Sequence, residues 1–96
     1  MSGGKKRIGV LVSGGGTNLQ ALIDAEGRGE LGNGTISLVI ASKPGVYALE
    51  RAKNHGIEAQ VLARKEYDSI ALYSRALADA LEAAKIDLAF RTKLVN

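Results

Sequence analysis

Short apolar runs and helical apolar patterns alternate along the whole chain. The first run, from Ile8 to Val12, is continuous, which is typical of a strand buried on both faces of a parallel sheet. After it, Leu19, Leu22 and Ile23 recur at the spacing of one helix face, and several glycines then end that pattern. The same succession repeats, with predicted strands at residues 35–42, 57–62 and 86–90 and predicted helices at 46–54 and from residue 68 onward.

Two of these helices have additional signals. The helix at 46–54 is followed by His55 and Gly56, and Gly56 is placed for a left-handed C-cap. The helix that begins near Asp68 has a predicted apolar face, which consists of Ile70, Tyr73, Leu77, Leu81 and Ala84. The resulting order β-α-β-α-β-α-β requires parallel strands joined by right-handed crossovers. We therefore expect an α/β fold with a doubly wound, Rossmann-like parallel sheet, or the first half of one.

Composition narrows the functional classes. A chain of 96 residues with 46% hydrophobic residues suits one small domain. A net charge of +3 and an aromatic content of 4% argue against a nucleic-acid partner, which usually meets a basic stripe with interleaved aromatics. Without cysteine and with one histidine, the chain has no disulfide and no expected metal site. No apolar run reaches the roughly 20 residues of a membrane span, so we expect no membrane partner and a cytoplasmic location.

The candidate chemistry lies where the first strand meets the first helix. Ser13 is followed by Gly14, Gly15 and Gly16, and then by Thr17 and Asn18 at the predicted helix start. Free backbone N–H groups at the positive end of a helix dipole form an anion site, and glycines let a phosphate approach the main chain. Thr17 and Asn18 can cap the helix or bind the anion with their side chains. The alternative is a tight strand-to-helix turn that binds nothing.

Two well-known phosphate loops fit this segment poorly. A nucleoside-triphosphate loop needs a Gly-Lys-Ser/Thr sequence, and no lysine stands at Thr17-Asn18. A dinucleotide loop would place its third glycine at Leu19 and an acid after the second strand, where the chain has Ser42 and Lys43. Lys43 is a possible partner for a ribose 2′-phosphate, although a solvated turn lysine is the simpler interpretation. A phosphomonoester is the better match to the loop.

The residues also resemble a known family. The stretches RIGVLVSGGGTNLQALIDA, SLVIASKPGVYALERAKNHGIEAQVL and YDSIALYSRALADAL are similar to the amino-terminal half of glycinamide ribonucleotide formyltransferase. The resemblance covers residues 7–89, and its most specific element is the run from Ser13 to Gln20. It implies that Gly16, Thr17 and Asn18 hold the 5′-phosphate of the substrate glycinamide ribonucleotide. It also implies 10-formyltetrahydrofolate as the cosubstrate of the full-length enzyme.

The same resemblance implies that this chain lacks the catalytic machinery. The family uses an Asn-x-His motif and a later Asp, both in the half that is absent here, so we expect the 96-residue chain alone to be inactive and to bind the folate poorly. His55 is not that histidine and is expected at a solvated helix end. Ile70 stands where some members have a polar residue near the folate, and Asp87 is expected to cap a turn or mark a strand start.

The carboxyl end departs from the family pattern. After KIDLA the sequence continues as FRTKLVN, which resembles the piece that lies just before the catalytic histidine in the family. One hypothesis is that Ala89 and Phe90 are not neighbours in the natural protein, which would place Asn96 on the catalytic asparagine. The alternative, of about equal weight, is a strand followed by an unrelated charged tail. We therefore divide the chain into a disordered or cloning-derived start (1–6), a phosphate-binding domain (7–89) and a carboxyl-terminal piece (90–96).

Two functional classes remain open. The chain is either the amino-terminal portion of a purine-pathway formyltransferase or a non-catalytic α/β phosphate-binding, nucleotide-binding or assembly module. In the second class, the last strand would be an unpaired sheet edge through which the chain associates with itself.

Overall fold

The computed structural model describes residues 6–12 and 17–91, without the side chains of residues 17, 18, 88, 90 and 91. Strands and helices alternate in the predicted order. The elements are β1 (Lys6–Val12), α1 (Thr17–Gly27), β2 (Gly34–Ala41), α2 (Tyr47–Asn54), β3 (Glu58–Val61), the short 3-10 helix η1 (Arg64–Glu66), α3 (Ile70–Ala83) and β4 (Leu88–Arg91).

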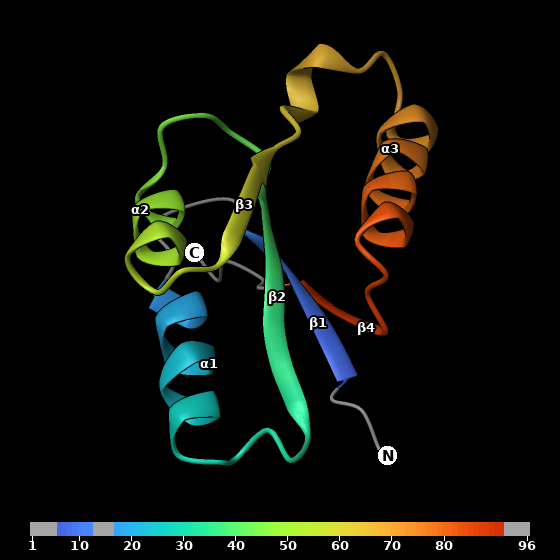
Figure 1. Ribbon diagram of the computed structural model, residues 1–96. Coiled ribbons are helices and arrows are strands. Elements are labelled where there is room, and N and C mark those ends of the chain that lie inside the picture. Colours follow the sequence, from blue (N-terminus) through green and yellow to red (C-terminus); the bar gives the residue numbers. More distant parts are fainter. Residues whose placement is uncertain (1–5, 13–16, 92–96) are drawn as a thin grey trace.

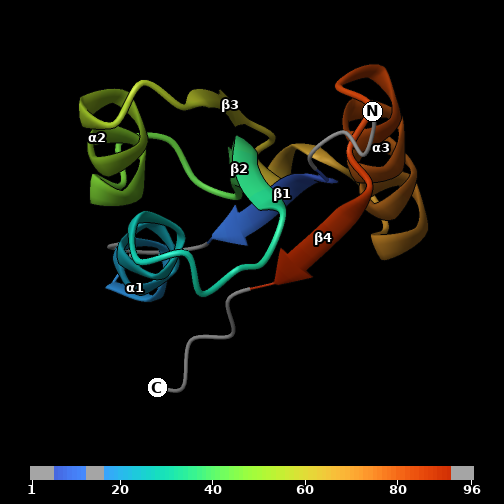
Figure 2. The same cartoon turned by 60° about the horizontal axis from the view of Figure 1, so that its bottom comes forward.

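The strands form one parallel sheet in the order β3-β2-β1-β4. Helices α1 and α2 cover one face of the sheet and α3 covers the other (Figures 1 and 2). The chain therefore winds outward from β1 in both directions, first through β2 to β3 and then across to β4. The predicted doubly wound α/β fold is confirmed.

Each face of the sheet has its own apolar core. The core under α1 and α2 contains Val10, Leu19 and Val39, all of which are fully buried. The core under α3 contains Leu38, Ile40 and Leu77. Because β1 and β2 contribute to both cores, they read in the sequence as continuous apolar runs rather than as alternating ones.

A bulge in β2 sets which residues reach each core. Ile8 pairs with Ile36, but the next residue, Gly9, pairs with Leu38, so that one extra residue of β2 lies between them. In a regular strand, residues three apart face opposite sides of the sheet. Because of the bulge, Ile36 and Val39 face the same core. The Glu26 carboxylate of α1 supports this bulge, since it accepts hydrogen bonds from the Ile36 N–H at 3.1 Å and from the Thr35 hydroxyl at 2.7 Å.

The predicted apolar face of α3 is correct except at its first residue. Leu77 is buried, and Tyr73, Leu81 and Ala84 pack against the same core. Ile70, in contrast, is 68% exposed. A helical side chain leans back onto the preceding turn, and Ile70 has no preceding turn because α3 begins there.

Candidate functional site

The candidate site lies at the carboxyl edge of the sheet, where the strand order reverses. Val12, the last residue of β1, pairs with Ala41 of β2, and Leu11 pairs with Arg91 of β4 on the other side. Ligands of doubly wound folds bind outside the carboxyl ends of the strands at such a point. The segment that leaves β1 here leads directly into α1.

The structure describes this segment only at its two ends. Gly14, Gly15 and Gly16 lie outside the described residues. Thr17 and Asn18 are the first two residues of α1, as expected for residues at the positive end of a helix dipole, but their side chains are not described. Asn96 also lies outside the described residues, beyond Arg91 at the carboxyl end of β4.

A polar network crosses from α2 to the start of α1. Arg51 donates a hydrogen bond of 2.9 Å from Nη1 to Oε1 of Gln20. Nε2 of Gln20 donates in turn to Oδ1 of Asp24 at 3.0 Å. The Arg51 guanidinium carbon also lies 4.7 Å from the centre of the Tyr47 ring, a cation–π distance. This network could not be predicted from the sequence, because Gln20 lies off the apolar stripe and Arg51 has the pattern of an exposed scaffold residue.

At the end of β2, the backbone groups of Ser42 are hydrogen-bonded within the protein. The Ser42 N–H donates to the Val12 carbonyl at 2.9 Å, and the Ser42 carbonyl accepts from the Arg64 N–H at 3.1 Å. Lys43 is exposed, as the solvated-turn interpretation expected. No acid stands at this strand end, so the ribose contact of a dinucleotide site has no carboxylate here.

A cationic and aromatic cluster follows β3 and was also missed from the sequence. The rings of Tyr67 and Tyr73 meet edge to face with centroids 5.3 Å apart, and the Arg64 guanidinium lies 5.6 Å from the Tyr73 centroid. The Tyr73 hydroxyl donates to the Leu62 carbonyl at 2.8 Å. These contacts pin the start of α3 to the end of β3, which accounts for the cluster structurally.

His55 and Asp87 lie away from the carboxyl edge. His55 is the exposed C-cap of α2 and precedes the amino end of β3, so it stands at the opposite edge of the sheet from the end of β1. Its neighbour Gly56 has a φ of 70°, which confirms the predicted left-handed turn. Asp87 precedes β4, where its Oδ2 accepts a hydrogen bond of 2.8 Å from the Arg7 N–H. It marks a strand start, as the sequence predicted.

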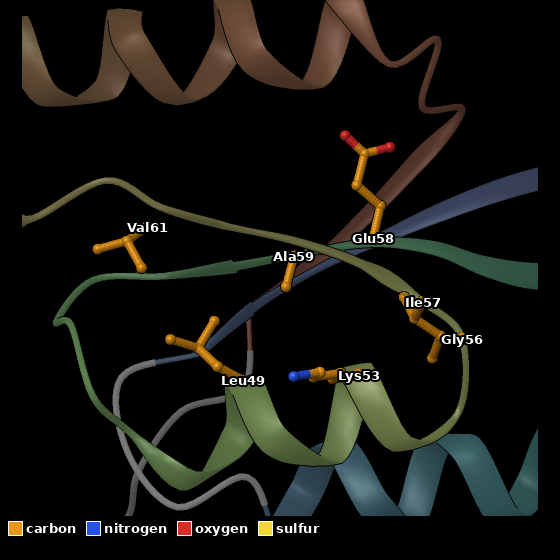
Figure 3. Close-up of a pocket in the computed structure, with 7 residues that line it drawn as sticks. All are labelled: Leu49, Lys53, Gly56, Ile57, Glu58, Ala59 and Val61. Carbon is orange, nitrogen blue, oxygen red and sulfur yellow. The ribbon is translucent and has the colours of Figure 1, made fainter.

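An open groove of about 640 Å³ runs between α2 and the outer strand β3 (Figure 3). Leu49 and Lys53 of α2 lie along one side, and the other side consists of Gly56, Ile57, Glu58, Ala59 and Val61. Its lining is mainly apolar, and β2 separates β3 from β1 in the sheet. The groove is therefore distinct from the carboxyl end of β1.

Charged groups elsewhere in the described part of the chain form an ion pair rather than a metal-type cluster. Arg28 and Glu30 form an exposed ion pair of 3.0 Å beyond the carboxyl end of α1. The hydrogen bond and charge of Arg28 lower the pKa of the Glu30 carboxyl from its ordinary value. Within residues 6–12 and 17–91, acidic and histidine side chains form no group of three suited to a metal ion. None of the helices described there is long and apolar enough to cross a membrane.

Comparisons with known proteins agree with this architecture. Residues 6–93 match the family described as formyl transferase. The trifunctional purine biosynthetic protein adenosine-3 of Drosophila melanogaster is 45% identical over 85 residues, which are 88% of this chain and 6% of that protein. The phosphoribosylglycinamide formyltransferase of Haemophilus influenzae is 40% identical over 83 residues, which are 86% of this chain and 39% of that protein.

Solved structures give the same result at the level of the fold. Glycinamide ribonucleotide transformylase 1 from Symbiobacterium toebii superposes with a TM-score of 0.81 at 39% identity, over 99% of this chain and 46% of that one. The enzyme of the same name from Geobacillus kaustophilus gives a TM-score of 0.79 at 35% identity, over 96% of this chain and 50% of that one. The chain thus spans half or less of the length of each of these relatives.

Proposed function

Because this chain belongs to the formyl transferase family, we propose that it forms the substrate-phosphate portion of a phosphoribosylglycinamide formyltransferase of purine synthesis. In this proposal Gly14, Gly15, Gly16, Thr17 and Asn18 bind the 5′-phosphate of glycinamide ribonucleotide. The observation that carries the proposal is the position of the two elements that flank this segment. Its two ends are the carboxyl end of β1 and the first residue of α1, at the point where strand order reverses.

The chemistry of formyl transfer defines what the chain supplies and what it does not. The substrate amine attacks the formyl carbon of 10-formyltetrahydrofolate, the bond from that carbon to N10 breaks, and tetrahydrofolate leaves. A proton must leave the amine and another must reach the leaving nitrogen, which requires a positioned acid and base. His55 is the one histidine of the chain and lies at the far edge of the sheet. We therefore expect the 96 residues alone to show no formyl transfer and only weak binding of the folate cosubstrate.

The carboxyl-terminal assignment is a separate proposal. It holds that Asn96 corresponds to the catalytic asparagine of the family. The junction predicted between Ala89 and Phe90 falls within β4, and the family match continues to residue 93. Sequencing the coding DNA across codons 85 to 96 tests the junction. Relatives that continue through this position with no additional segment would contradict it.

The deciding experiment is an amide NMR titration of the chain with glycinamide ribonucleotide, with inorganic phosphate and NAD as controls. We expect selective shifts of the Gly14 to Asn18 amides with the ribonucleotide, smaller shifts with phosphate and none with NAD. A well-dispersed spectrum that responds to none of the three would contradict the phosphate assignment. A parallel assay with 10-formyltetrahydrofolate should give no product, and turnover would contradict the expected inactivity.

The second candidate function is a non-catalytic binding or assembly module. The observation that favours it is the position of β4, which pairs with β1 and has no strand on its outer side within the described residues. An exposed strand edge can pair with another chain, including a second copy of itself. Dependence of molecular mass on concentration tests this candidate.

A further inference from the structure

The outer strand β3 presents main-chain groups along its free edge. Leu62, just after β3, donates from its N–H to the Ala41 carbonyl of β2 at 2.9 Å. Main-chain groups alternate from one side of a strand to the other, so Ala59 and Val61 direct theirs away from β2. Within the described residues, no strand lies on that side of β3. An extended peptide can pair with such an edge.

The side chains of the same two residues form part of the groove beside α2. Ala59 and Val61 line it from β3, and Leu49 lines it from α2 (Figure 3). Val61 is a large apolar side chain that stays 40% exposed. Leu49 and Ile57 are partly buried and pack against the core under α1 and α2. The groove therefore continues that core to the surface, where further apolar side chains would be removed from water.

The charge inside the groove comes from Lys53. Figure 3 shows its amine between α2 and β3, whereas Glu58 extends from β3 on the side away from α2. No carboxylate of the described residues forms an ion pair with Lys53. The charge that faces the apolar lining is therefore positive, and a carboxylate complements it. Lys53 also lies in the last turn of α2, where a cation stabilises the helix, so a test must separate the two roles.

We propose that the groove between α2 and β3 binds an extended, acidic peptide segment of another protein. The segment adds as a strand to the outer side of β3, with its main chain paired to Ala59 and Val61. Its alternate apolar side chains enter the groove, and one carboxylate side chain lies beside Lys53. Because β3 has four residues, it offers an edge of about 13 Å at 3.3 Å per residue.

The occupant follows from charge, and it does not depend on the phosphate assignment. The other outer strand, β4, contains no acidic residue. A second copy of the chain that joined through its β4 would therefore not supply the carboxylate. The groove is also distinct from the carboxyl end of β1, since β2 separates β3 from β1. Failure of the phosphate titration would leave this proposal standing, and the reverse also holds.

The first arm of the test is a selection with the 96-residue chain from a displayed library of random eight-residue peptides. We expect enriched peptides to share apolar residues at alternate positions and an Asp or Glu. A synthetic copy of an enriched peptide should shift the amide signals of Ala59 and Val61 and the methyl signals of Leu49, and leave the Ala89 amide of β4 unchanged. Absence of such a pattern, or shifts that fall outside the groove, would overturn the proposal.

The second arm tests the charge. Lys53→Glu should weaken binding of the selected peptide about tenfold or more, because the cation that meets the carboxylate becomes an anion. Lys85→Glu is the matched control, since Lys85 is an exposed cation just past the end of α3. Both changes place an acid near the carboxyl end of a helix, so the melting temperatures should fall similarly while only Lys53→Glu loses affinity. Equal affinities would overturn the role of Lys53.

The third arm tests strand addition without changing the protein. Two versions of the selected peptide are N-methylated at every second residue, in opposite phases. One version loses the N–H groups that face β3, and the other keeps them. We expect only the second version to bind, because main-chain pairing supplies the affinity in this mode. Equal affinity of the two versions would overturn strand addition.

The last arm distinguishes a second copy of the chain as the occupant. Sedimentation of the chain with and without the selected peptide should show the same association behaviour, because the peptide occupies β3 only. If the peptide dissociates oligomers of the chain, and Val61→Lys dissociates them as well, the groove is an interface between copies. That result would overturn the assignment to another protein.

Discussion

Gly9 lies in β1 at a position where the sheet and α3 approach closely. A Cβ atom at Gly9 would lie 2.8 Å from Cδ2 of Leu81 and 3.2 Å from Cγ2 of Ile86. Gly9→Val should therefore lower the free energy of unfolding by about 1–3 kcal/mol, because the core under α3 would be overpacked. Urea unfolding followed by circular dichroism measures the loss.

Gly27 provides a control at a position where an added Cβ atom has room. A Cβ there would meet no atom within 4 Å, so Gly27→Ala should leave stability unchanged or raise it slightly. A Gly9→Val chain as stable as the Gly27→Ala chain would show that α3 moves away from β1 at little cost.

A second test at the residue scale concerns the Glu26 carboxylate, which accepts a hydrogen bond from the backbone at the bulge of β2. Glu26→Ala would leave the N–H of the buried Ile36 without its acceptor, at a cost of about 1–3 kcal/mol in unfolding free energy. Glu26→Gln keeps an oxygen for the same N–H and should lose less than half as much. Thermal unfolding of the two variants makes the comparison. Equal losses would indicate that the negative charge, rather than the acceptor, is what β2 requires.

At the scale of elements, Asp87 fastens β4 to β1 before their pairing begins. Its Oδ2 accepts from the Arg7 N–H, and its own N–H donates to the Arg7 carbonyl, each at 2.8 Å. Asp87→Ala should lower stability by about 1 kcal/mol and speed amide exchange at Ala89, while Ala52 of α2 exchanges at its original rate. Asp87→Asn should be milder, since its side-chain oxygen still accepts. Unchanged exchange at Ala89 would mean that the backbone pairing with β1 is enough to hold β4 in place.

The elements were predictable because their apolar periods are local features of the sequence. The run from Ile8 to Val12 predicts a buried strand, and β1 is one. The bulge of β2 could not be predicted in this way, because it depends on a bond from Glu26, ten residues earlier in the chain. The exposure of Ile70 could not be predicted either, because apolar periodicity does not show at which residue a helix begins.

In the candidate site, too, local features were predictable and contacts between distant residues were not. A glycine run between a strand and a helix is a local signal, and its two flanking elements occur where the sequence placed them. The Arg51–Gln20 contact joins residues 31 apart and follows from how α1 and α2 pack, which no spacing in the sequence encodes. The phosphate roles of Gly14 to Asn18 and the role of Asn96 stay predictions, which the binding experiments address.

At the scale of the whole molecule, the sheet has two outer strands, β3 and β4, and each pairs on one side only within the described residues. They differ in what protects them. The outer strand β3 is accompanied by α2, whose Leu49 and Lys53 line the groove beside it. Among the described elements, β4 pairs only with the central strand β1. If the chain associates through a strand edge, β4 is therefore the edge that we expect to pair.

Sedimentation velocity over a range of concentrations tests this expectation. The average mass should rise from that of one chain toward that of two, because unpaired N–H and C=O groups of one β4 can pair with those of another. Ala89→Lys places a charge on the exposed side of β4 and should shift the rise to higher concentration. Val61→Lys, the same kind of change on the 40% exposed Val61 of β3, should leave the curve unchanged. A strictly monomeric profile at high concentration would contradict association altogether, and a response to Val61→Lys alone would assign it to β3.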